Sequence, residues 1–296
     1  MPDALERCAA LVVSYNTRLE LEQCLGALTQ ATTGLEIVVS DNGSTDGSAQ
    51  LVRERFPGVK LVDNGANLGF GRGANAAAAA TDRELLLLLN PDCAAGPDAI
   101  RRLVHCLDEH PGAGFAGPRI LLDSGQVDHA CLRADPDPAG ALLYVTRVAR
   151  LFPRSARVNR YSLRHLDYTQ DQELLAGMGA CLMFRASAFH EVGGFDPEFF
   201  MYGEDLDLCR RVREKGWTGR YCAGAVVTHR KGEATRQASQ RMLVEFHRSM
   251  WTYYRKHEAA RHHPAFNVLV GAGIVGLATA RLARNAARRE KRVSAR

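Results

Sequence analysis

The sequence predicts an α/β fold in which a mostly parallel β-sheet is covered by helices on both faces. In the first half of the chain, short apolar runs alternate with segments of helical length. The apolar runs are unbroken, and each is followed by a polar loop. An unbroken apolar run is typical of a strand buried on both faces, as the strands of a parallel sheet are.

The predicted elements follow one another in a regular order. Strands are predicted at 9–15, 35–40, 59–62 and 85–89, and helices at 18–28, after 41–48, from Ala74 onward and at 97–109. The loop 41–48 offers Ser44, Thr45 or Asp46 as the N-cap of the helix after it. Later in the chain, a helix is predicted to begin near Glu204, and a short strand is predicted at 225–228.

The net charge of +5 is concentrated at the C-terminus. Residues 281–296 contain seven basic side chains and one acidic one, which leaves 31 basic and 32 acidic side chains for the other 280 residues. A protein that coats nucleic acid spreads its positive charge over a domain face. We therefore expect no nucleic-acid partner, and the 46% of hydrophobic residues is typical of a globular, enzyme-sized chain.

The eight cysteines are scattered and contain no C-x-x-C pair. This spacing disfavours a zinc site and a disulfide-rich domain, and it favours a reducing compartment. The first eight residues contain charge but no long apolar run, so no signal peptide is expected. We therefore expect any catalytic machinery to face the cytoplasm.

Four polar loops follow the four predicted strands, at 15–17, 41–44, 67–71 and 90–92. Ligands of parallel sheets bind outside the carboxyl ends of the strands. Loops of this composition supply backbone N–H groups and carboxylates that fit a nucleotide. Ordinary turn chemistry is the alternative for any single loop, but four such loops at one sheet edge favour a nucleotide site.

Asp92 is the sharpest candidate at this edge, because it follows five leucines at the mouth of a central strand. A carboxylate there is well placed to hold Mg²⁺ or Mn²⁺, which bridges a diphosphate and neutralises charge on a leaving group. A helix-capping role before Pro97 is the alternative.

A second cluster, residues 193–208, combines aromatic and acidic side chains. Glu204 and Asp205 would occupy the first turn of the predicted helix, where the helix dipole stabilises acids. A carboxylate beside the aromatic loop can also act as general base toward a sugar hydroxyl. Spacing alone leaves both interpretations open.

Two further features carry charge. His229 follows the short strand 225–228 and is either a structural residue or a metal ligand.

Between residues 142 and 165 there are six arginines and no acid, which indicates either a solvated face or a cationic lip for a phosphate-bearing or membrane-bound substrate. The six are Arg147, Arg150, Arg154, Arg157, Arg160 and Arg164.

Two glycine motifs do not predict a dinucleotide site. Residues 271–276 match G-x-G-x-x-G, but only twenty residues follow, too few for the rest of such a fold. Residues 71–76 match G-x-G-x-x-A, but no lone ribose-binding acid follows at the required distance. The chain also lacks a P-loop motif, so we exclude NAD and P-loop chemistry.

Together the motifs resemble those of family 2 glycosyltransferases with the GT-A fold, and especially bacterial rhamnosyltransferases that build cell-wall polysaccharide. The likeness extends over residues 11–236 and is carried by 12–16, 41–48, 67–71 with Asn75, 90–92, 179–183 and 193–208. It implies a Rossmann-like, mostly parallel sheet with a helical C-terminal extension. The implied domains are a glycosyltransferase domain over 1–240 and a C-terminal segment over 241–296.

The resemblance also implies roles for single residues. Asp205, beside Glu204, would be the catalytic base that activates the acceptor, and Asp92 and His229 would hold Mg²⁺ or Mn²⁺. The nucleotide-sugar donor would be bound by Tyr15, Asn16, Asp41, Asn42, Ser44, Asn67, Gly69, Asn75, Asn90 and Arg236. One departure is that Asn90 replaces the first acid of the family's D-x-D motif. A second is that residues 231–236 replace a glycine-rich stretch ending in Ser-Thr.

The implied activity is an inverting transfer of a sugar, with L-rhamnose from dTDP-rhamnose as our best expectation, to a polyprenyl-diphosphate-linked or polysaccharide acceptor. A UDP- or GDP-sugar donor is one alternative. A non-catalytic carbohydrate- or nucleotide-binding scaffold is another, although the intact acids Asp92, Glu204 and Asp205 argue against it. A nucleotidyltransferase would require a glycine-rich basic loop where residues 15–17 lie.

The C-terminal segment 241–296 is predicted to associate with a membrane surface. Residues 264–280 carry no charge, and Arg281 begins the basic tail. This apolar stretch is short for a spanning helix, which needs about twenty residues. A core or homodimer-interface helix and a segment lying on the membrane with its arginines on lipid phosphates both stay open. We expect a cytoplasmic enzyme, peripheral on the inner face of the cell membrane.

Overall fold

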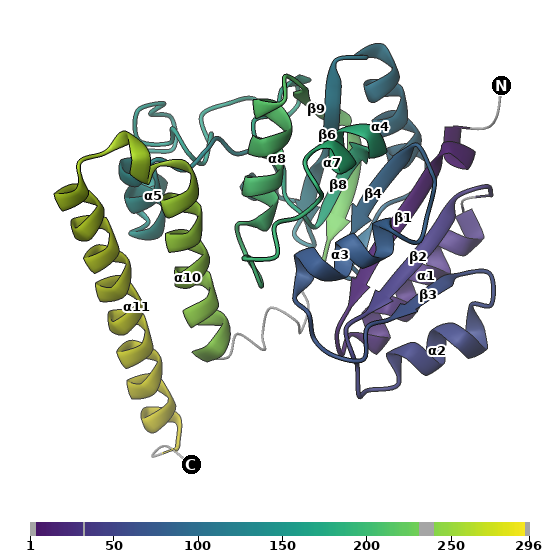
Figure 1. The fold of residues 1–296 in the computed structure, drawn as a ribbon, viewed down its shortest axis with the longest axis horizontal. Helices are drawn as coiled ribbons and strands as arrows, with labels where there is room; N and C mark the ends of the chain where they lie inside the picture. The colour runs from purple at the N-terminus through teal and green to yellow at the C-terminus, as the bar shows by residue number, and fades with distance from the viewer. Residues whose placement is uncertain (1–3, 32, 231–239, 294–296) are drawn as a thin grey trace.

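The computed structural model describes residues 4–31, 33–230 and 240–293. At its centre is one nine-stranded sheet with the strand order β3-β2-β1-β4-β8-β6-β9-β5, and β7 pairs with β9 outside this order. Helices cover the sheet, and two long C-terminal helices stand at the end of the molecule away from β1–β3 (Figure 1).

The N-terminal half is the parallel part of the sheet, as the sequence predicts. Strands β1 (Cys8–Ser14), β2 (Glu36–Asp41), β3 (Lys60–Asp63) and β4 (Leu85–Leu89) run parallel to one another, with β1 between β2 and β4. They alternate with η1 (Ala4–Arg7), α1 (Arg18–Ala31), α2 (Ser48–Arg55), α3 (Phe70–Ala78) and α4 (Pro97–Glu109). All five leucines of β4 are buried, because the sheet is covered on both faces here.

The second half makes the sheet mixed. Strand β8 (Cys181–Arg185) runs antiparallel between β4 and β6 (Ala113–Leu122), and β6 pairs in parallel with β9 (Thr218–His229). The short strands β5 (Cys93–Ala94) and β7 (Gln172–Glu173) pair antiparallel with β9. The connections contain η2 (His129–Cys131), α5 (Pro138–Val145), α6 (Val148–Leu151), α7 (Ala186–Glu191) and α8 (Glu204–Glu214).

Three local expectations need correction. Helix α3 begins at Phe70 rather than near Ala74, because Gly69 with φ 85° turns the chain directly into the helix. The N-cap of α2 is Gly47 rather than Ser44, Thr45 or Asp46, although Asp46 Oδ1 accepts a hydrogen bond from Ser48 N at 3.0 Å. The strand predicted at 225–228 is the end of the longer strand β9.

Two of the eight cysteines are paired. Cys106 of α4 and Cys222 of β9 form a disulfide, and the other six cysteines are free and buried. The scattered spacing, which favoured a reducing compartment, did not predict this pair, because residues 116 positions apart meet only through the fold.

The C-terminal segment forms α10 (Gln240–His257), η3 (Ala259–Arg261) and α11 (Pro264–Val293). Residues 271–276, which match a dinucleotide motif, lie inside α11. Over Pro264–Ala287, α11 is long and apolar enough to cross a membrane by length and composition alone, and none of its most apolar window is buried. The uncharged stretch therefore belongs to a longer helix than we expected, and that helix is not packed in the core.

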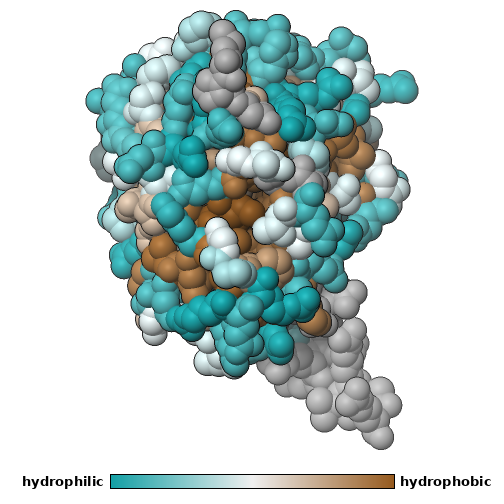
Figure 2. Space-filling view, turned by 90° about the vertical axis from the view of Figure 1, so that its right-hand side faces the viewer, coloured by the Kyte–Doolittle hydropathy of each residue, from teal (hydrophilic) through white to brown (hydrophobic). Residues whose placement is uncertain are grey.

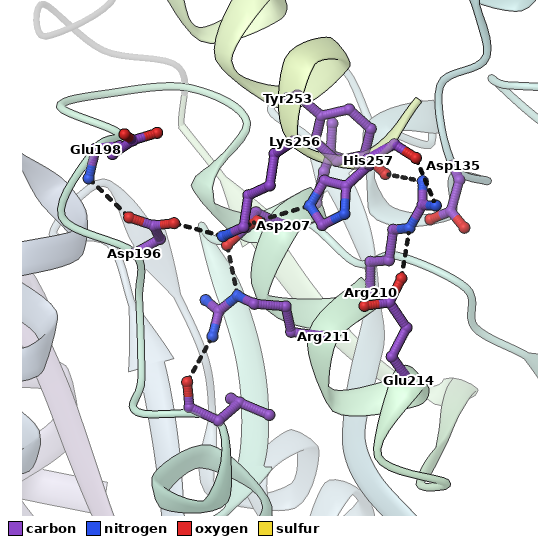
Figure 3. A network of polar contacts seen from close by, with 12 residues as sticks. Asp135, Asp196, Glu198, Asp207, Arg210, Arg211, Glu214, Tyr253, Lys256 and His257 are labelled. Atoms are coloured by element: carbon purple, nitrogen blue, oxygen red, sulfur yellow. Dashed lines mark hydrogen bonds and ion pairs between the residues drawn. The ribbon is translucent and has the colours of Figure 1, made fainter. Parts of the chain in front are cut away.

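Helix α10 is joined to α8 by a network of charged side chains, shown in Figure 3 and called here the α8–α10 clasp. The Asp207 carboxylate is fully buried; its Oδ1 lies 2.7 Å from His257 Nε2 and 2.8 Å from Lys256 Nζ, and its Oδ2 accepts from Arg211 Nε at 2.7 Å. Lys256 also pairs with Asp196. Because α8 begins with Glu204 and Asp205, the clasp holds the C-terminal helices against the element that carries both predicted catalytic acids.

We expect Asp207→Asn to lower the free energy of unfolding by roughly 3 kcal/mol, because the fully buried side chain would lose the negative charge that pairs with Arg211 and Lys256. Hydrogen bonds from His257 and Lys256 and the Arg211 charge lower the pKa of Asp207 to about 2 despite its burial. A carboxyl with a depressed folded-state pKa stabilises the fold above its ordinary pKa near 4. That contribution, about 2 kcal/mol, disappears as pH falls toward 2.

Urea unfolding of both proteins between pH 6 and pH 2.5 measures this effect. The difference in unfolding free energy between wild type and Asp207→Asn should shrink steadily below pH 4. Glu198→Gln is the matched control, because the Glu198–Arg255 pair is more than half exposed and should contribute little. A difference that is constant with pH would contradict the role of Asp207.

Apolar surface also occurs away from the C-terminal helices. Figure 2 looks onto the side that lies on the right in Figure 1, where hydrophobic side chains gather in a hollow framed by hydrophilic ones. A surface pocket lined by Glu22, Thr29, Arg55 and Phe56 lies between α1 and the end of α2. It contains none of the predicted site residues.

Candidate active site

The loops after β1 and β2 are joined by hydrogen bonds at the carboxyl edge of the sheet. The backbone N–H of Asn16 donates to Ser44 Oγ at 2.9 Å, and Asn16 Oδ1 accepts from Thr45 N at 2.8 Å. Asn42 N donates to Ser14 O at 2.8 Å. Asn16 has φ 53°, in the left-handed region that asparagine tolerates better than most residues. Tyr15, Asn16, Asp41, Asn42 and Ser44 therefore lie in one connected pair of loops.

Asp41 has an unused acceptor in this pair of loops. Its side chain is buried, and Oδ1 accepts from Ser44 N at 2.8 Å, whereas the buried Oδ2 has no hydrogen-bond partner among the residues that the structure describes. A buried carboxylate oxygen without a donor is unfavourable unless a ligand supplies one. Asp41 is thus suited to accept a hydrogen bond from a base or ribose of a nucleotide.

The predicted donor-binding residues of the segment 67–75, which spans the start of α3, have contacts with other parts of the chain. Gly69 approaches the loop before α8 so closely that a Cβ there would lie 2.2 Å from Phe200 O. Asn67 Oδ1 accepts from Gly69 N at 3.0 Å. The Asn75 amide both donates to and accepts from the Phe195 backbone, at 2.9 and 2.8 Å. These contacts fix α3 against the loop before α8, and a direct role in donor binding stays a prediction.

Asp92 and His229 meet at the end of β4. The β5–β9 pairing sets Cys93 opposite His229, and Asp92 Oδ2 lies 3.3 Å from His229 Nε2. Ligand atoms of Asp92, Cys93 and His229 lie within 4.8 Å of one another. Asp92 Oδ1 is buried, and it has no hydrogen-bond partner in the described part of the chain. One carboxylate oxygen and one imidazole nitrogen thus converge on a point at the carboxyl edge of the sheet.

These donors fit a divalent cation. Carboxylate oxygen suits Mg²⁺ and Mn²⁺, and an imidazole nitrogen suits transition metals. The Cys93 thiol is the poorest ligand of the three, because burial raises its pKa well above the ordinary value. Asp128 Oδ2 lies 3.8 Å from His229 Nδ1, so a carboxylate faces the second ring nitrogen, as is common for metal-binding histidines.

Asp205 is held rigidly at the start of α8. Its Oδ2 accepts from Arg133 Nη2 at 2.7 Å and from Gly179 N at 3.0 Å, and its Oδ1 accepts from Leu206 N at 2.8 Å. An ionised carboxylate has about four lone-pair sites. These three hydrogen bonds fix the side chain and leave about one site for another donor.

Glu204 lies in a different environment, although it is the next residue. Burial and the neighbouring Asp205 charge raise the pKa of Glu204, and its buried Oε2 has no hydrogen-bond partner among the described residues. Glu204 therefore favours the neutral form, and Asp205, which accepts hydrogen bonds from Arg133 and Gly179, is the better candidate for a charged base.

Two residues connect the β4 turn to Asp205. Asn90 N donates to Ala180 O at 2.9 Å. Gly179, the residue before Ala180, donates its backbone N–H to Asp205 Oδ2. A Cβ added to Gly179 would lie 3.5 Å from Asp205 Cβ. The Asn90–Asp92 turn and the Asp205 carboxylate are therefore both hydrogen-bonded to the segment 179–180.

Sequence reasoning missed Arg133 and Asp128. Arg133 is 72 residues from Asp205, and Asp128 is about a hundred residues from His229, so no local motif links either pair. The only available signal was that buried charges need partners. Arg236, predicted to bind the donor, lies outside the described residues.

The fold of this chain is similar to that of proteins of known structure. A mannosyltransferase from Pyrobaculum calidifontis, PcManGT, solved with GDP-Man and Mn²⁺, aligns with a TM-score of 0.58 and 18% identity over 95% of this chain and 75% of its own. GalNAc-T7, solved with UDP, GalNAc and Mn²⁺, aligns with a TM-score of 0.59 and 16% identity over 82% of this chain and 47% of its own. At these identities the likeness establishes the fold, which is that of the GT-A glycosyltransferases.

Sequence comparison identifies the family within this class. A family model described as "Glycosyltransferase like family 2" matches residues 6–246, so the chain belongs to that family and is a glycosyltransferase. A relative from Mycobacterium tuberculosis is 31% identical over 255 residues, 82% of each chain. It is named N-acetylglucosaminyl-diphospho-decaprenol L-rhamnosyltransferase.

Proposed function

We propose that this glycosyltransferase moves L-rhamnose from dTDP-rhamnose to a hydroxyl of a polyprenyl-diphosphate-linked sugar, with inversion at the anomeric carbon. The observation that carries the proposal is that the Asn90–Asp92 turn and Asp205 are hydrogen-bonded to the neighbouring residues Ala180 and Gly179. A leaving diphosphate and an attacking hydroxyl must occupy such neighbouring positions in a single displacement. The name of the M. tuberculosis relative supports the choice of sugar and acceptor.

In this mechanism Asp205 accepts the proton of the acceptor hydroxyl as its oxygen attacks the anomeric carbon. The hydrogen bonds from Arg133 and Gly179 hold the carboxylate in one orientation, which lowers the entropic cost of reaching the reactive geometry. The buried Asp41 Oδ2 accepts a hydrogen bond from the nucleoside. The loop residues Tyr15, Asn16 and Ser44 contact the same nucleoside.

Asp92 and His229 would hold a divalent cation, Mg²⁺ or Mn²⁺. When bound, such a cation supplies positive charge that stabilises the departing nucleoside diphosphate. The Mn²⁺ named with both structural neighbours supports this assignment. Asp128 would orient the His229 ring through its other nitrogen.

We further propose that the enzyme is peripheral on the cytoplasmic face of the membrane, attached through α11. The exposed apolar window of that helix and the arginines that follow support this location. A second copy of the chain is the alternative partner for α11.

The donor and acceptor are tested by measuring nucleoside diphosphate release from dTDP-rhamnose, UDP-sugars and GDP-mannose. Each donor is combined with Mg²⁺ or Mn²⁺, with and without N-acetylglucosaminyl-diphospho-polyprenol. We expect acceptor-dependent release with the highest kcat/KM for dTDP-rhamnose, and a product with the anomeric configuration opposite to the donor. A higher kcat/KM for another donor would contradict the sugar assignment, and retention would contradict the single displacement.

A further inference from the structure

The exposed apolar side chains of this protein are unevenly distributed. Fourteen large hydrophobic side chains are exposed among the described residues. Ten of them lie on α10 and α11 or on residues 138–166, called here the α5–α6 region. They are Leu142, Tyr144, Leu151, Phe152, Val244, Trp251, Phe266, Val268, Leu269 and Val275. Leu151 is 74% exposed and Val268 71%, although burying either would be favourable.

The two groups belong to neighbouring parts of the surface. Arg281 of α11 donates from Nη2 to Val145 O, the last residue of α5, at 3.0 Å. The same guanidinium lies over the Phe246 ring of α10, 5.8 Å from its centroid. Figure 1 shows α5 beside the α10–α11 pair at the end of the molecule away from β1–β3.

The α5–α6 region is also strongly cationic. Residues 138–166 contain six arginines and no acid. Arg147, Arg150, Arg154 and Arg157 are exposed, and none of the four forms a salt bridge within the part of the chain that the structure describes. Burial and the neighbouring charges of Arg284 and Arg147 lower the pKa of Arg281, so like charges from the turn before α6 and from α11 lie close together. An anionic partner would relieve this repulsion.

A series of contacts connects this surface to Asp205, the predicted catalytic base. The rings of Tyr144 on α5 and Tyr161 pack edge to face with centroids 5.0 Å apart. Tyr161 O accepts from Ala134 N at 2.9 Å, and the residue before Ala134 is Arg133, which binds Asp205. An acceptor anchored in a lipid layer over α5 would therefore have its head group near Asp205.

We propose that the α5–α6 region is a second membrane contact, which forms with α11 one docking surface for anionic phospholipid. Leu151 and Phe152 enter the interfacial layer, and the neighbouring arginines bind lipid phosphates. The proposal rests on the proposed lipid-linked acceptor, since it explains how that acceptor reaches a base on the protein. A second copy of the chain is a poorer occupant, because symmetric pairing of this surface would bring the arginines of both copies together.

The test is binding of the full-length protein to vesicles of phosphatidylcholine with a quarter phosphatidylglycerol, measured by co-sedimentation against vesicles of phosphatidylcholine alone. The variant Leu151→Glu/Phe152→Glu replaces two exposed side chains and should fold normally. We expect it to bind the anionic vesicles roughly tenfold more weakly than wild type. The matched control Leu19→Glu changes a 71% exposed leucine of α1 outside the surface and should bind like wild type.

Three outcomes would overturn the inference. The double variant binds the anionic vesicles as wild type does; wild type binds neither kind of vesicle; or light scattering shows a wild-type dimer that the double variant dissociates. If Val268→Glu alone abolishes binding and the double variant has no effect, α11 is the only contact. Vesicle binding is measured without donor, so failure of the proposed transfer reaction would appear separately, as missing nucleotide release by protein that still binds vesicles.

Discussion

Asp205→Asn is expected to lower kcat for sugar transfer by roughly 10²–10⁴-fold, because an amide cannot accept the proton of the acceptor hydroxyl. Donor affinity should change little, since the contacts of Asp205 are with Arg133, Gly179 and its own helix rather than with the nucleotide loops. Transfer rates at saturating donor and donor affinity by calorimetry give the two quantities separately. Full transfer activity in the variant would contradict the assignment of Asp205 as base.

Glu204→Gln is the matched control for this prediction. Burial and the neighbouring Asp205 charge raise the pKa of Glu204 and so favour its neutral form, and glutamine is neutral and has nearly the same shape. We expect a loss of transfer activity of less than about tenfold. A loss in Glu204→Gln as large as that in Asp205→Asn would instead assign the base to Glu204.

A structural effect of Asp205→Asn must be separated from the chemical one. Arg133 and Asp205 are both mostly buried, with side chains 12% exposed, so the substitution leaves the Arg133 charge without its anion. The loss of stability from breaking such a pair is about 3–5 kcal/mol. Urea unfolding at the assay temperature shows whether the variant is folded, and intact donor binding by the folded fraction then attributes the lost rate to chemistry.

Much of the fold follows from local sequence patterns. The run Leu85–Leu89 is unbroken and ends at Asn90-Pro91, so a buried strand and its end were both predictable. Helix α4 begins at Pro97 and ends at Glu109, as predicted, because proline favours the first turn and the apolar positions repeat at helical spacing. The antiparallel insertion of β8 between β4 and β6 was not predicted, because strand order depends on contacts between distant segments.

The candidate site divides in a similar way. Asp92, His229 and Asp205 were selected from local motifs, and the fold brings Asp92 and His229 within 3.3 Å of each other. Their partners Asp128 and Arg133 stand in segments without a motif, and only the folded chain brings them near. The clasp around Asp207 could not be predicted either, since its cations come from α10 as well as α8.

The second large effect is expected for Asp92→Ala. Asp92 Oδ1 is buried without a hydrogen-bond partner among the described residues, and Oδ2 faces His229, so the side chain is the central oxygen donor of the proposed cation site. Replacing it with alanine removes the charged ligand and leaves one imidazole and a buried thiol, a poor set for Mg²⁺ or Mn²⁺. We expect Mn²⁺ to tighten donor binding at least about tenfold in wild type and less than about twofold in Asp92→Ala.

Calorimetric titration of the donor at increasing Mn²⁺ concentration measures this coupling without requiring turnover. Asp82→Ala is the matched control, because Asp82 is an exposed acid near the other end of β4, where a lost carboxylate should leave the Mn²⁺ effect unchanged. His229→Asn should give an intermediate effect, since the carboxylate remains but its nitrogen partner is replaced. If Mn²⁺ tightens donor binding equally in wild type and Asp92→Ala, then Asp92 does not hold the cation. The buried Asp92 Oδ1 would then need another hydrogen-bond partner, which a group of the bound nucleotide would supply.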